Sequence, residues 1–145
     1  MVNAEISVNT SNVPQMLVRR NASAEIKIDA ANPNNHTGIS LQANTSYLLE
    51  VVGVQDWRDW YITTDPRGYM KWYLRPTAPF LRVPNQPYFA LMGYLAPEPS
   101  KPFFIGMSLP LTPSKGGELI CFANDVPCMY WNNSGVLTLK ITCQG

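Results

Sequence analysis

The sequence is poor in charge and has no long apolar run. Asp, Glu, Lys and Arg make up 14% of the 145 residues, and the formal net charge is +1. Binding that depends on phosphate neutralisation needs clustered Lys and Arg, so we expect no nucleic-acid partner. The apolar stretches are too short for a helix that crosses a bilayer, so we expect no membrane span. A hydrophobic content of 46% nevertheless favours a folded chain with one core.

Secretory and disulfide signals are missing as well. The opening residues, MVNAEISVNTSNVPQ, contain neither the basic nor the apolar region of a signal peptide. We therefore expect a protein of the cytoplasm, or one exported by a non-classical route. Cys121, Cys128 and Cys143 are odd in number, and no pair has C-x-x-C spacing, which argues against a disulfide framework or a compact zinc or redox motif. We interpret them as unpaired thiols, with one intramolecular bridge left open.

What the sequence does contain is a series of short alternating segments separated by turn residues. Such runs, divided by motifs such as DPRG, TPSKGG and NNSG, predict an all-β sandwich of two antiparallel sheets. We expect one domain over residues 1–145, with residues 1–23 as an N-terminal arm or an added strand. The predicted strands are Ala24–Ala30, Ser46–Val54, Pro87–Leu95, Phe103–Leu109, Glu118–Ala123 and Val136–Cys143.

A long middle connection, Gln55–Pro87, interrupts this pattern. It holds three of the four tryptophans, Trp57, Trp60 and Trp72. A connection of this length in a compact domain is usually functional. We expect these three rings to pack in the core or at an interface. The only histidine, His36, lies in NPNNHTG, and we predict a turn residue without an acidic partner.

The segment NDVPCMYWNNSG, Asn124–Gly135, is unusually long for a hairpin loop. Hairpin loops usually have about 2–5 residues, and a hairpin brings the two ends of its loop together. Asp125, Asn132 and Asn133 place hard oxygen donors at those ends, which are the donors that Ca²⁺ prefers. For two consecutive amides to reach one ion, they must lie in a turn and not along a strand. The alternative is a loop in which these side chains only bind nearby backbone amides.

The same segment resembles the calcium and sugar loop of the PA-I-type galactophilic lectins, the bacterial LecA-like family. The match consists of Asn124-Asp125-Val126-Pro127, then Tyr130, then Asn132 to Gly135; Gly38–Gly53 is similar to the early hairpin of the family. The resemblance implies a jelly-roll-like sandwich that forms homo-oligomers and holds one Ca²⁺. By position, the implied metal ligands are the side chains of Asp125, Asn132 and Asn133 and the backbone carbonyls of Tyr61 and Met129.

The resemblance also implies that the ion binds two vicinal sugar hydroxyls, in galactose or a related glycoside. Asp125, Val126 and Asn132 are the implied hydrogen-bonding partners of that sugar. Where the family has a His and a Gln that contact the exocyclic hydroxyl, this sequence has Arg75 and Ala78. Arg75 suits a carboxylate or phosphate on a sugar, or is a solvated loop residue. Trp131, beside the amides, is a candidate for stacking on the sugar.

These observations lead us to expect a calcium-dependent, non-catalytic carbohydrate-binding protein. One alternative is a structural sandwich that serves in an assembly and binds no sugar. Another is a glycan-processing enzyme that uses Asp56, Asp59 or Asp65, which we interpret instead as loop-capping or surface residues.

Overall fold

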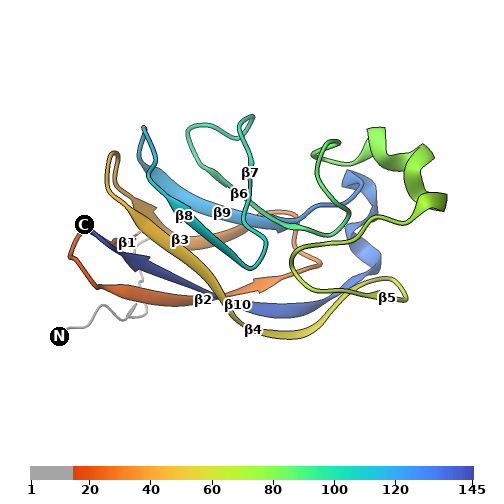
Figure 1. The fold of residues 1–145 in the computed structure, drawn as a ribbon, viewed down its shortest axis with the longest axis horizontal. Coiled ribbons are helices and arrows are strands. Elements are labelled where there is room, and N and C mark those ends of the chain that lie inside the picture. The colour runs from red at the N-terminus through yellow and green to blue at the C-terminus, as the bar shows by residue number, and fades with distance from the viewer. Residues whose placement is uncertain (1–14) are drawn as a thin grey trace.

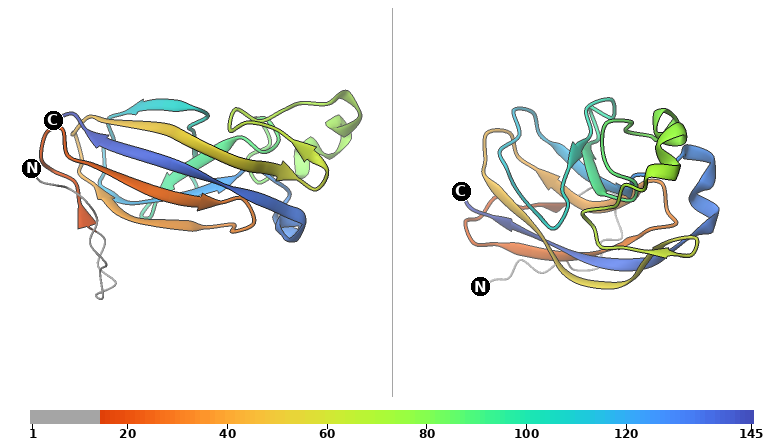
Figure 2. Two further views of the ribbon diagram at one scale, coloured as in Figure 1. Left: turned by 90° about the horizontal axis from the view of Figure 1, so that it is seen from below. Right: turned by 45° about the vertical axis from the view of Figure 1, so that its right-hand side comes forward.

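The chain folds into two β-sheets packed face to face (Figure 1; Figure 2). A computed structural model describes residues 15–145. One sheet has the strand order β1–β3–β9–β6–β7, and the other has the order β2–β10–β4–β5, with β8 also paired to β4. The predicted all-β sandwich is therefore confirmed. The elements are β1 (Gln15–Met16), β2 (Ser23–Asp29), β3 (Asn35–Leu41), β4 (Tyr47–Asp59), β5 (Ile62–Thr63), the 3-10 helix η1 (Trp72–Phe80), β6 (Leu91–Leu95), β7 (Phe103–Phe104), β8 (Ser108–Leu111), β9 (Gly117–Ala123), the 3-10 helix η2 (Pro127–Asn132) and β10 (Asn133–Cys143).

The predicted N-terminal arm is described only in its second part. Within residues 15–23, β1 pairs in parallel with β3, while the other strand pairs of the described chain are antiparallel. Residues 1–14 lie outside the described residues. The described part of the arm therefore adds a short edge strand to the first sheet.

The core lies between the two sheets, as the alternation in the strands dictates. In β10, every second residue from Leu137 to Cys143 is buried, because side chains on a strand point alternately to its two faces. Trp57 and Tyr47 are the largest fully buried side chains. Their polar groups are satisfied: the Trp57 indole donates to the Phe89 carbonyl (3.0 Å), and the Tyr47 hydroxyl donates to the Leu17 carbonyl (2.8 Å).

Two predicted hairpins are wrong. The strands β9 and β10 belong to different sheets, and so do β3 and β4, so each connection crosses the sandwich. The last connection is also shorter than expected, because β10 begins at Asn133 and η2 fills much of the space before it. Alternation identifies a strand, but the choice of sheet depends on which distant strand it pairs with, and short-range pattern does not show this.

Three other expectations also need correction. The predicted strand Phe103–Leu109 is two strands, β7 and β8, because Gly106 lies between them with φ +61°. His36 lies in β3, not in a turn, and its Nδ1 is 3.2 Å from Oε1 of Glu118. The first residues of the middle connection, through Asp59, continue β4.

The end of the sandwich opposite the C-terminus carries most of the irregular structure. There η1, η2 and β5 lie close together (Figure 1; Figure 2). An isolated bridge between Tyr69 and Tyr88 closes the segment that contains η1. In the described part of the chain, no helix has the length and apolar character to cross a membrane. All three cysteines, Cys121, Cys128 and Cys143, are unpaired, as predicted.

Candidate functional site

The segment NDVPCMYWNNSG is held in place by its first and last residues. Asn124 is fully buried; its amide donates to the carbonyls of Val83 (3.0 Å), Gln86 (3.3 Å) and Pro87 (3.0 Å) and its oxygen accepts from the Val83 N–H (2.9 Å). Gly135 has φ +106°, and a Cβ there would lie 2.0 Å from the Asp56 carbonyl oxygen. The two ends of the motif therefore have structural roles. A ligand-binding role would fall to the residues between them.

Three buried oxygen atoms of this segment have no hydrogen-bond partner among the residues that the structure describes: Oδ2 of Asp125, Oδ1 of Asn132 and Oδ1 of Asn133. Asp125 is 4% exposed and Asn133 is 6% exposed. Leaving a buried carboxylate or amide oxygen without a donor costs about 1–3 kcal/mol each. Native structures rarely leave such groups unsatisfied, and the exceptions call for an explanation. In this segment the three exceptions belong to the three side chains that the sequence predicts as metal ligands; a fourth buried polar atom without a partner among residues 15–145, Nε of Arg58, lies on β4.

Asp125 carries a charge that the protein alone does not compensate. Its Oδ1 accepts a hydrogen bond from the Val126 N–H (2.7 Å), which leaves Oδ2 unpartnered. Burial raises the pKa of Asp125 to about 6; the charge of Asp59 acts in the same direction, while the Val126 N–H and the Asn133 amide lower it. A cation against Oδ2 would favour the charged carboxylate.

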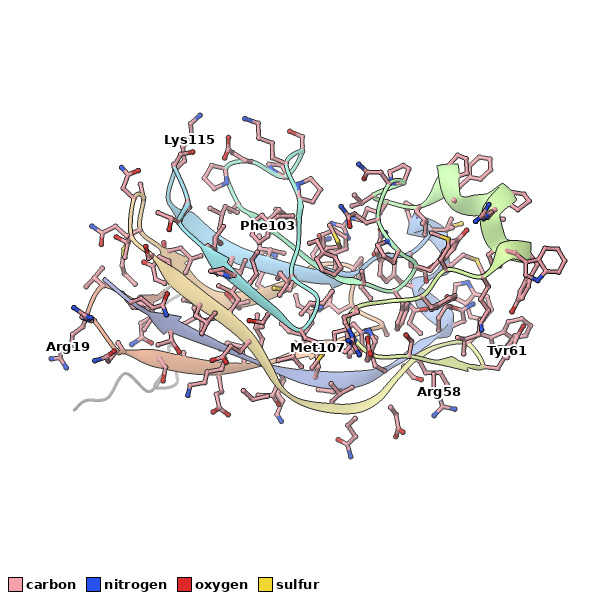
Figure 3. The ribbon with its side chains drawn as sticks, viewed as in Figure 1. Arg19, Arg58, Tyr61, Phe103, Met107 and Lys115 are labelled. Atoms are coloured by element: carbon pink, nitrogen blue, oxygen red, sulfur yellow. The ribbon has the colours of Figure 1, made fainter. Side chains whose placement is uncertain are left out.

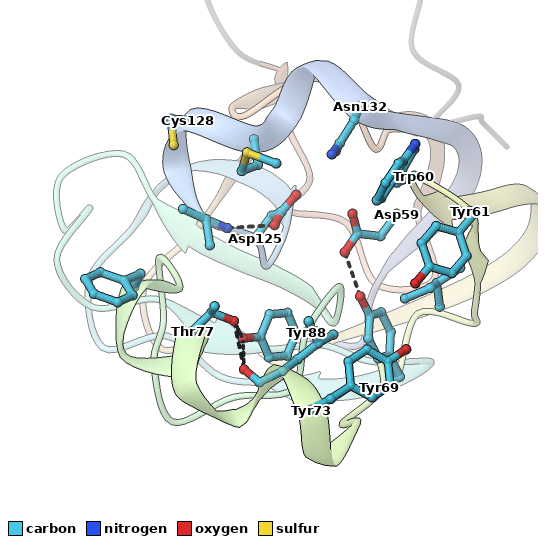
Figure 4. Close-up of a pocket in the computed structure, with 15 residues that line it drawn as sticks. Asp59, Trp60, Tyr61, Tyr69, Tyr73, Thr77, Tyr88, Asp125, Cys128 and Asn132 are labelled. Atoms are coloured by element: carbon cyan, nitrogen blue, oxygen red, sulfur yellow. Dashed lines mark hydrogen bonds between the residues drawn. The ribbon is translucent and has the colours of Figure 1, made fainter.

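The two amides reach this region from a junction between a helix and a strand. Asn132 ends η2, and Asn133 begins β10, so the pair does not lie along one strand. The Asn133 amide nitrogen donates to the Ala30 carbonyl (3.2 Å), which fixes the amide plane and leaves its oxygen free. Figure 4 shows the Asn132 amide nitrogen toward the pocket, so half a turn of that amide would bring its unpartnered oxygen inside.

A pocket of about 410 Å³ opens beside these oxygens (Figure 4). Its floor and rim come from the end of β4, from η1 and from η2. Aromatic rings dominate the lining, so the pocket combines a strongly apolar wall with a small group of oxygens. It is lined by Asp59, Trp60, Tyr61, Ile62, Tyr69, Tyr73, Leu74, Thr77, Phe80, Tyr88, Asp125, Val126, Cys128, Met129 and Asn132.

Most of the predicted site residues meet at this pocket. Tyr61, Met129 and Val126 line it together with Asp125 and Asn132, and Asn133 is buried next to Asp125. Tyr61 projects at the end of the molecule that carries η1 (Figure 3).

The residues predicted from the departures from the family do not join them. Arg75 and Ala78 lie on η1 outside the lining, and Trp131 is 77% exposed on η2, also outside it.

The structure tests the expected packing of the tryptophans in part. Trp57 is buried in the core, one of the two predicted outcomes, whereas Trp60 is 68% exposed and Trp72 is 80% exposed, so for these two rings only the interface alternative stays a prediction. Trp60 lines the pocket and contacts Tyr61 edge-on, with ring centroids 5.0 Å apart. Its backbone N–H donates to the Asn132 carbonyl (3.0 Å), which ties the end of β4 to the end of η2. Trp60 is therefore a pocket residue that composition and spacing did not separate from the core.

Asp59 is another pocket residue that the sequence did not assign to the calcium site. Asp65 is a loop-capping residue, as expected, since its Oδ1 accepts from the Arg67 N–H (2.7 Å), and Asp56 is exposed. Asp59, in contrast, lines the pocket, pairs in register with Asn133 and acts on the charge of Asp125. In the sequence it lies in the middle connection, where we weigh it only as an acid of the enzyme alternative and interpret it as a loop-capping or surface residue.

The donor set fits a hard cation. Within residues 15–145, no three His, Cys, Asp or Glu side chains form a group that could hold a metal, so a cation here would also need amide or carbonyl oxygens. The unpartnered oxygens are one carboxylate and two amides, and Ca²⁺ accepts such oxygens together with backbone carbonyls. No donor within residues 15–145 is bonded to these three atoms.

Of the comparisons with known proteins, only the one with solved structures found a similarity, and it concerns the fold. No family model and no curated protein matches the sequence. A solved structure described as "EclA N-terminal domain; PllA-like lectin" superposes with a TM-score of 0.61 and 18% identity, and the match covers 82% of this chain and 94% of that chain. At this identity the likeness establishes a common architecture, and it does not reach the galactophilic family that the loop motif resembles. The chain thus shares its β-sandwich with a domain described as a lectin.

Proposed function

We propose that the protein is a carbohydrate-binding protein, a lectin, that uses Ca²⁺ at the pocket end of the sandwich. The observation that carries this proposal is the set of three buried oxygens of Asp125, Asn132 and Asn133 without partners. The fold pairs both ends of the amides of Asn35 and Asn124, its other buried asparagines within residues 15–145. Leaving these three oxygens without partners adds nothing to its stability. The shared sandwich with a protein described as a lectin supports the same conclusion.

The residues that would hold the ion come from the segment just after β4 and from the segment 125–133. Oδ2 of Asp125 and the oxygens of Asn132 and Asn133 are the side-chain donors, and the carbonyls of Tyr61 and Met129 remain the proposed backbone donors. When bound, Ca²⁺ supplies open coordination positions for two vicinal hydroxyls of a sugar. The protein around it buries the carboxylate and fixes the Asn133 amide plane through Ala30.

The wall of the pocket suits the apolar face of a sugar ring. Trp60, Tyr61 and Tyr73 line one side, and sugar rings stack well on aromatic faces. Galactose or a related glycoside remains the proposed ligand, with hydrogen bonds to Asp125, Val126 and Asn132. Because Arg75 and Trp131 lie outside the lining, we propose them only as contacts to a more distant part of a larger glycan.

Isothermal titration of galactose and of methyl galactosides tests this function. We expect binding in Ca²⁺ buffer, loss of binding with EDTA and recovery when excess Ca²⁺ is restored. Binding that survives EDTA contradicts the metal-bridged mechanism. A glycan array in calcium buffer then identifies the sugar, and no bound glycan in the array contradicts the proposed function itself.

Exposed aromatic residues favour a second candidate, a role in assembly. Trp72 is 80% exposed and Phe80 is 67% exposed, both on η1, and Trp131 is 77% exposed on η2. Large exposed rings of this kind are enriched at protein–protein interfaces. Size-exclusion chromatography with light scattering tests whether the chain forms homo-oligomers. Oligomers that dissociate in a Trp72→Ala variant, together with a negative glycan array, would favour assembly over sugar binding.

A further inference from the structure

We infer that Asp59 supplies a second carboxylate to the cation site, an inference that rests on the proposed calcium-dependent function. Asp59 is the last residue of β4 and pairs in register with Asn133, the first residue of β10. This pairing brings its side chain to the pocket that Asp125 and Asn132 also line. In Figure 4 its carboxylate points into the pocket, toward the side on which Asp125 lies.

The Asp59 carboxylate is held in position by a tyrosine. The Tyr69 hydroxyl donates to Oδ2 of Asp59 at 2.6 Å. Tyr69 is itself fixed: its N–H donates to the Tyr88 carbonyl (2.8 Å), it accepts from the Tyr88 N–H (3.0 Å), and its ring stacks on that of Tyr88 with centroids 5.7 Å apart. The other oxygen of Asp59 has no hydrogen bond to the described residues and faces the pocket (Figure 4).

An acidic pair alone would not identify a ligand site. Here the pair stands beside a carboxylate that is 4% exposed and has one oxygen without a partner, and beside two amide oxygens in the same condition. Two carboxylates facing one another without a cation repel, so the arrangement favours a divalent ion between them. With both carboxylates present, a bound Ca²⁺ would be fully neutralised, and affinity for Ca²⁺ rises with the charge of its ligands.

Calorimetric titration of CaCl₂ into the metal-free full chain tests the inference. Asp59→Asn keeps an oxygen that can accept from Tyr69 and removes only the charge. We expect it to weaken Ca²⁺ binding by about 10–100-fold, the usual effect of losing a group that supports a metal site. The matched control is Asp56→Asn, an exposed residue of the same strand at φ +54°, a conformation that Asn tolerates. Because exposed charges are screened, we expect this control to stay within about twofold of the wild type.

The outcomes separate this inference from the proposed function. A wild type that binds Ca²⁺, with Asp59→Asn within about twofold of it, overturns the role of Asp59 alone. Equal losses in the Asp59 and Asp56 variants also overturn it, since they indicate a general field. A wild type that binds no Ca²⁺ overturns both proposals. Circular dichroism checks the fold of each variant. If Asp59→Asn does not fold, the Ca²⁺ affinity of Asp59→Glu is measured instead. Glu keeps the charge but displaces the carboxylate, so an unchanged Ca²⁺ affinity contradicts the inference.

Discussion

Two groups of buried Asn and Asp side chains in this protein behave in opposite ways. Asn35, the first residue of β3, and Asn133, at the pocket, are both 6% exposed. The Asn35 amide donates to the carbonyls of Asp29, Asn32 and Cys121, and its oxygen accepts from the Asp29 N–H. The Asn133 nitrogen donates to the Ala30 carbonyl, but its oxygen has no donor among the described residues.

The difference indicates which polar residues the fold needs and which it tolerates. Asn35 and Asn124 satisfy both ends of their amides, so they connect segments that are distant in sequence. Asp125, Asn132 and Asn133 each leave an oxygen unpartnered in the same interior. Since a burial cost without a compensating bond is rarely retained, we interpret the second group as shaped for a ligand.

The largest effect on stability is expected for the group whose amides have all their hydrogen bonds satisfied, Asn35 and Asn124. Asn124→Ala removes four hydrogen bonds: the Val83 N–H loses its acceptor, and the carbonyls of Val83, Gln86 and Pro87 each lose one donor. We expect the free energy of unfolding to fall by about 3–5 kcal/mol, measured by urea denaturation. Asn85→Ala, at an exposed neighbouring position, serves as control and should change it by less than about 0.5 kcal/mol. Equal stability of the two variants would remove the structural half of the comparison.

For the residues with an unpartnered oxygen, a substitution should change Ca²⁺ binding and not lower stability. Asp125→Asn removes the buried carboxylate and is expected to weaken Ca²⁺ binding by about 100-fold or more, measured by calorimetry. In metal-free buffer the same variant should be at least as stable as the wild type, because an uncompensated buried charge has been removed. Asp65→Asn, whose partner is Arg67 and which lies outside the pocket lining, is the control for Ca²⁺ binding. A metal-free Asp125→Asn variant as unstable as Asn124→Ala would contradict this interpretation.

The smallest effect should separate the aromatic wall from the cation site. Trp60→Ala removes a ring from the pocket lining without touching the oxygens. We expect sugar affinity to fall about fivefold, because such ring contacts contribute about 1 kcal/mol, while Ca²⁺ affinity stays unchanged. Trp72→Ala, 80% exposed and outside the lining, should leave both affinities as they are. Loss of Ca²⁺ binding in Trp60→Ala would show that wall and cation site are not independent.

The sequence predicted the local features of the fold better than the distant pairings. Alternation identified β2 and β10 within a few residues, and the NDVP and NNSG motifs drew attention to the three residues with unpartnered oxygens. The hairpins were wrong because nothing in a short window shows that β9 pairs with β3 and β6 whereas β10 pairs with β2 and β4. The partner of His36, Glu118, was missed for the same reason.

The candidate site shows the same limit. Asp59 enters it through a strand register that joins it to Asn133, far along the chain. Trp57 and Trp60 have similar sequence surroundings, yet one is buried and the other is exposed, because Trp60 lies just beyond the strand with φ +55°. A backbone reversal of that kind redirects a side chain, and composition cannot reveal it.

The most direct test of the account is a crystal structure of the protein soaked in calcium chloride. We predict one ion with Oδ2 of Asp125 at about 2.3–2.6 Å and with the amide oxygens of Asn132 and Asn133 as ligands. The Asn132 amide should then present its oxygen to the ion. A well-ordered map with no density between these three side chains would contradict the calcium site and, with it, the proposed mode of sugar binding.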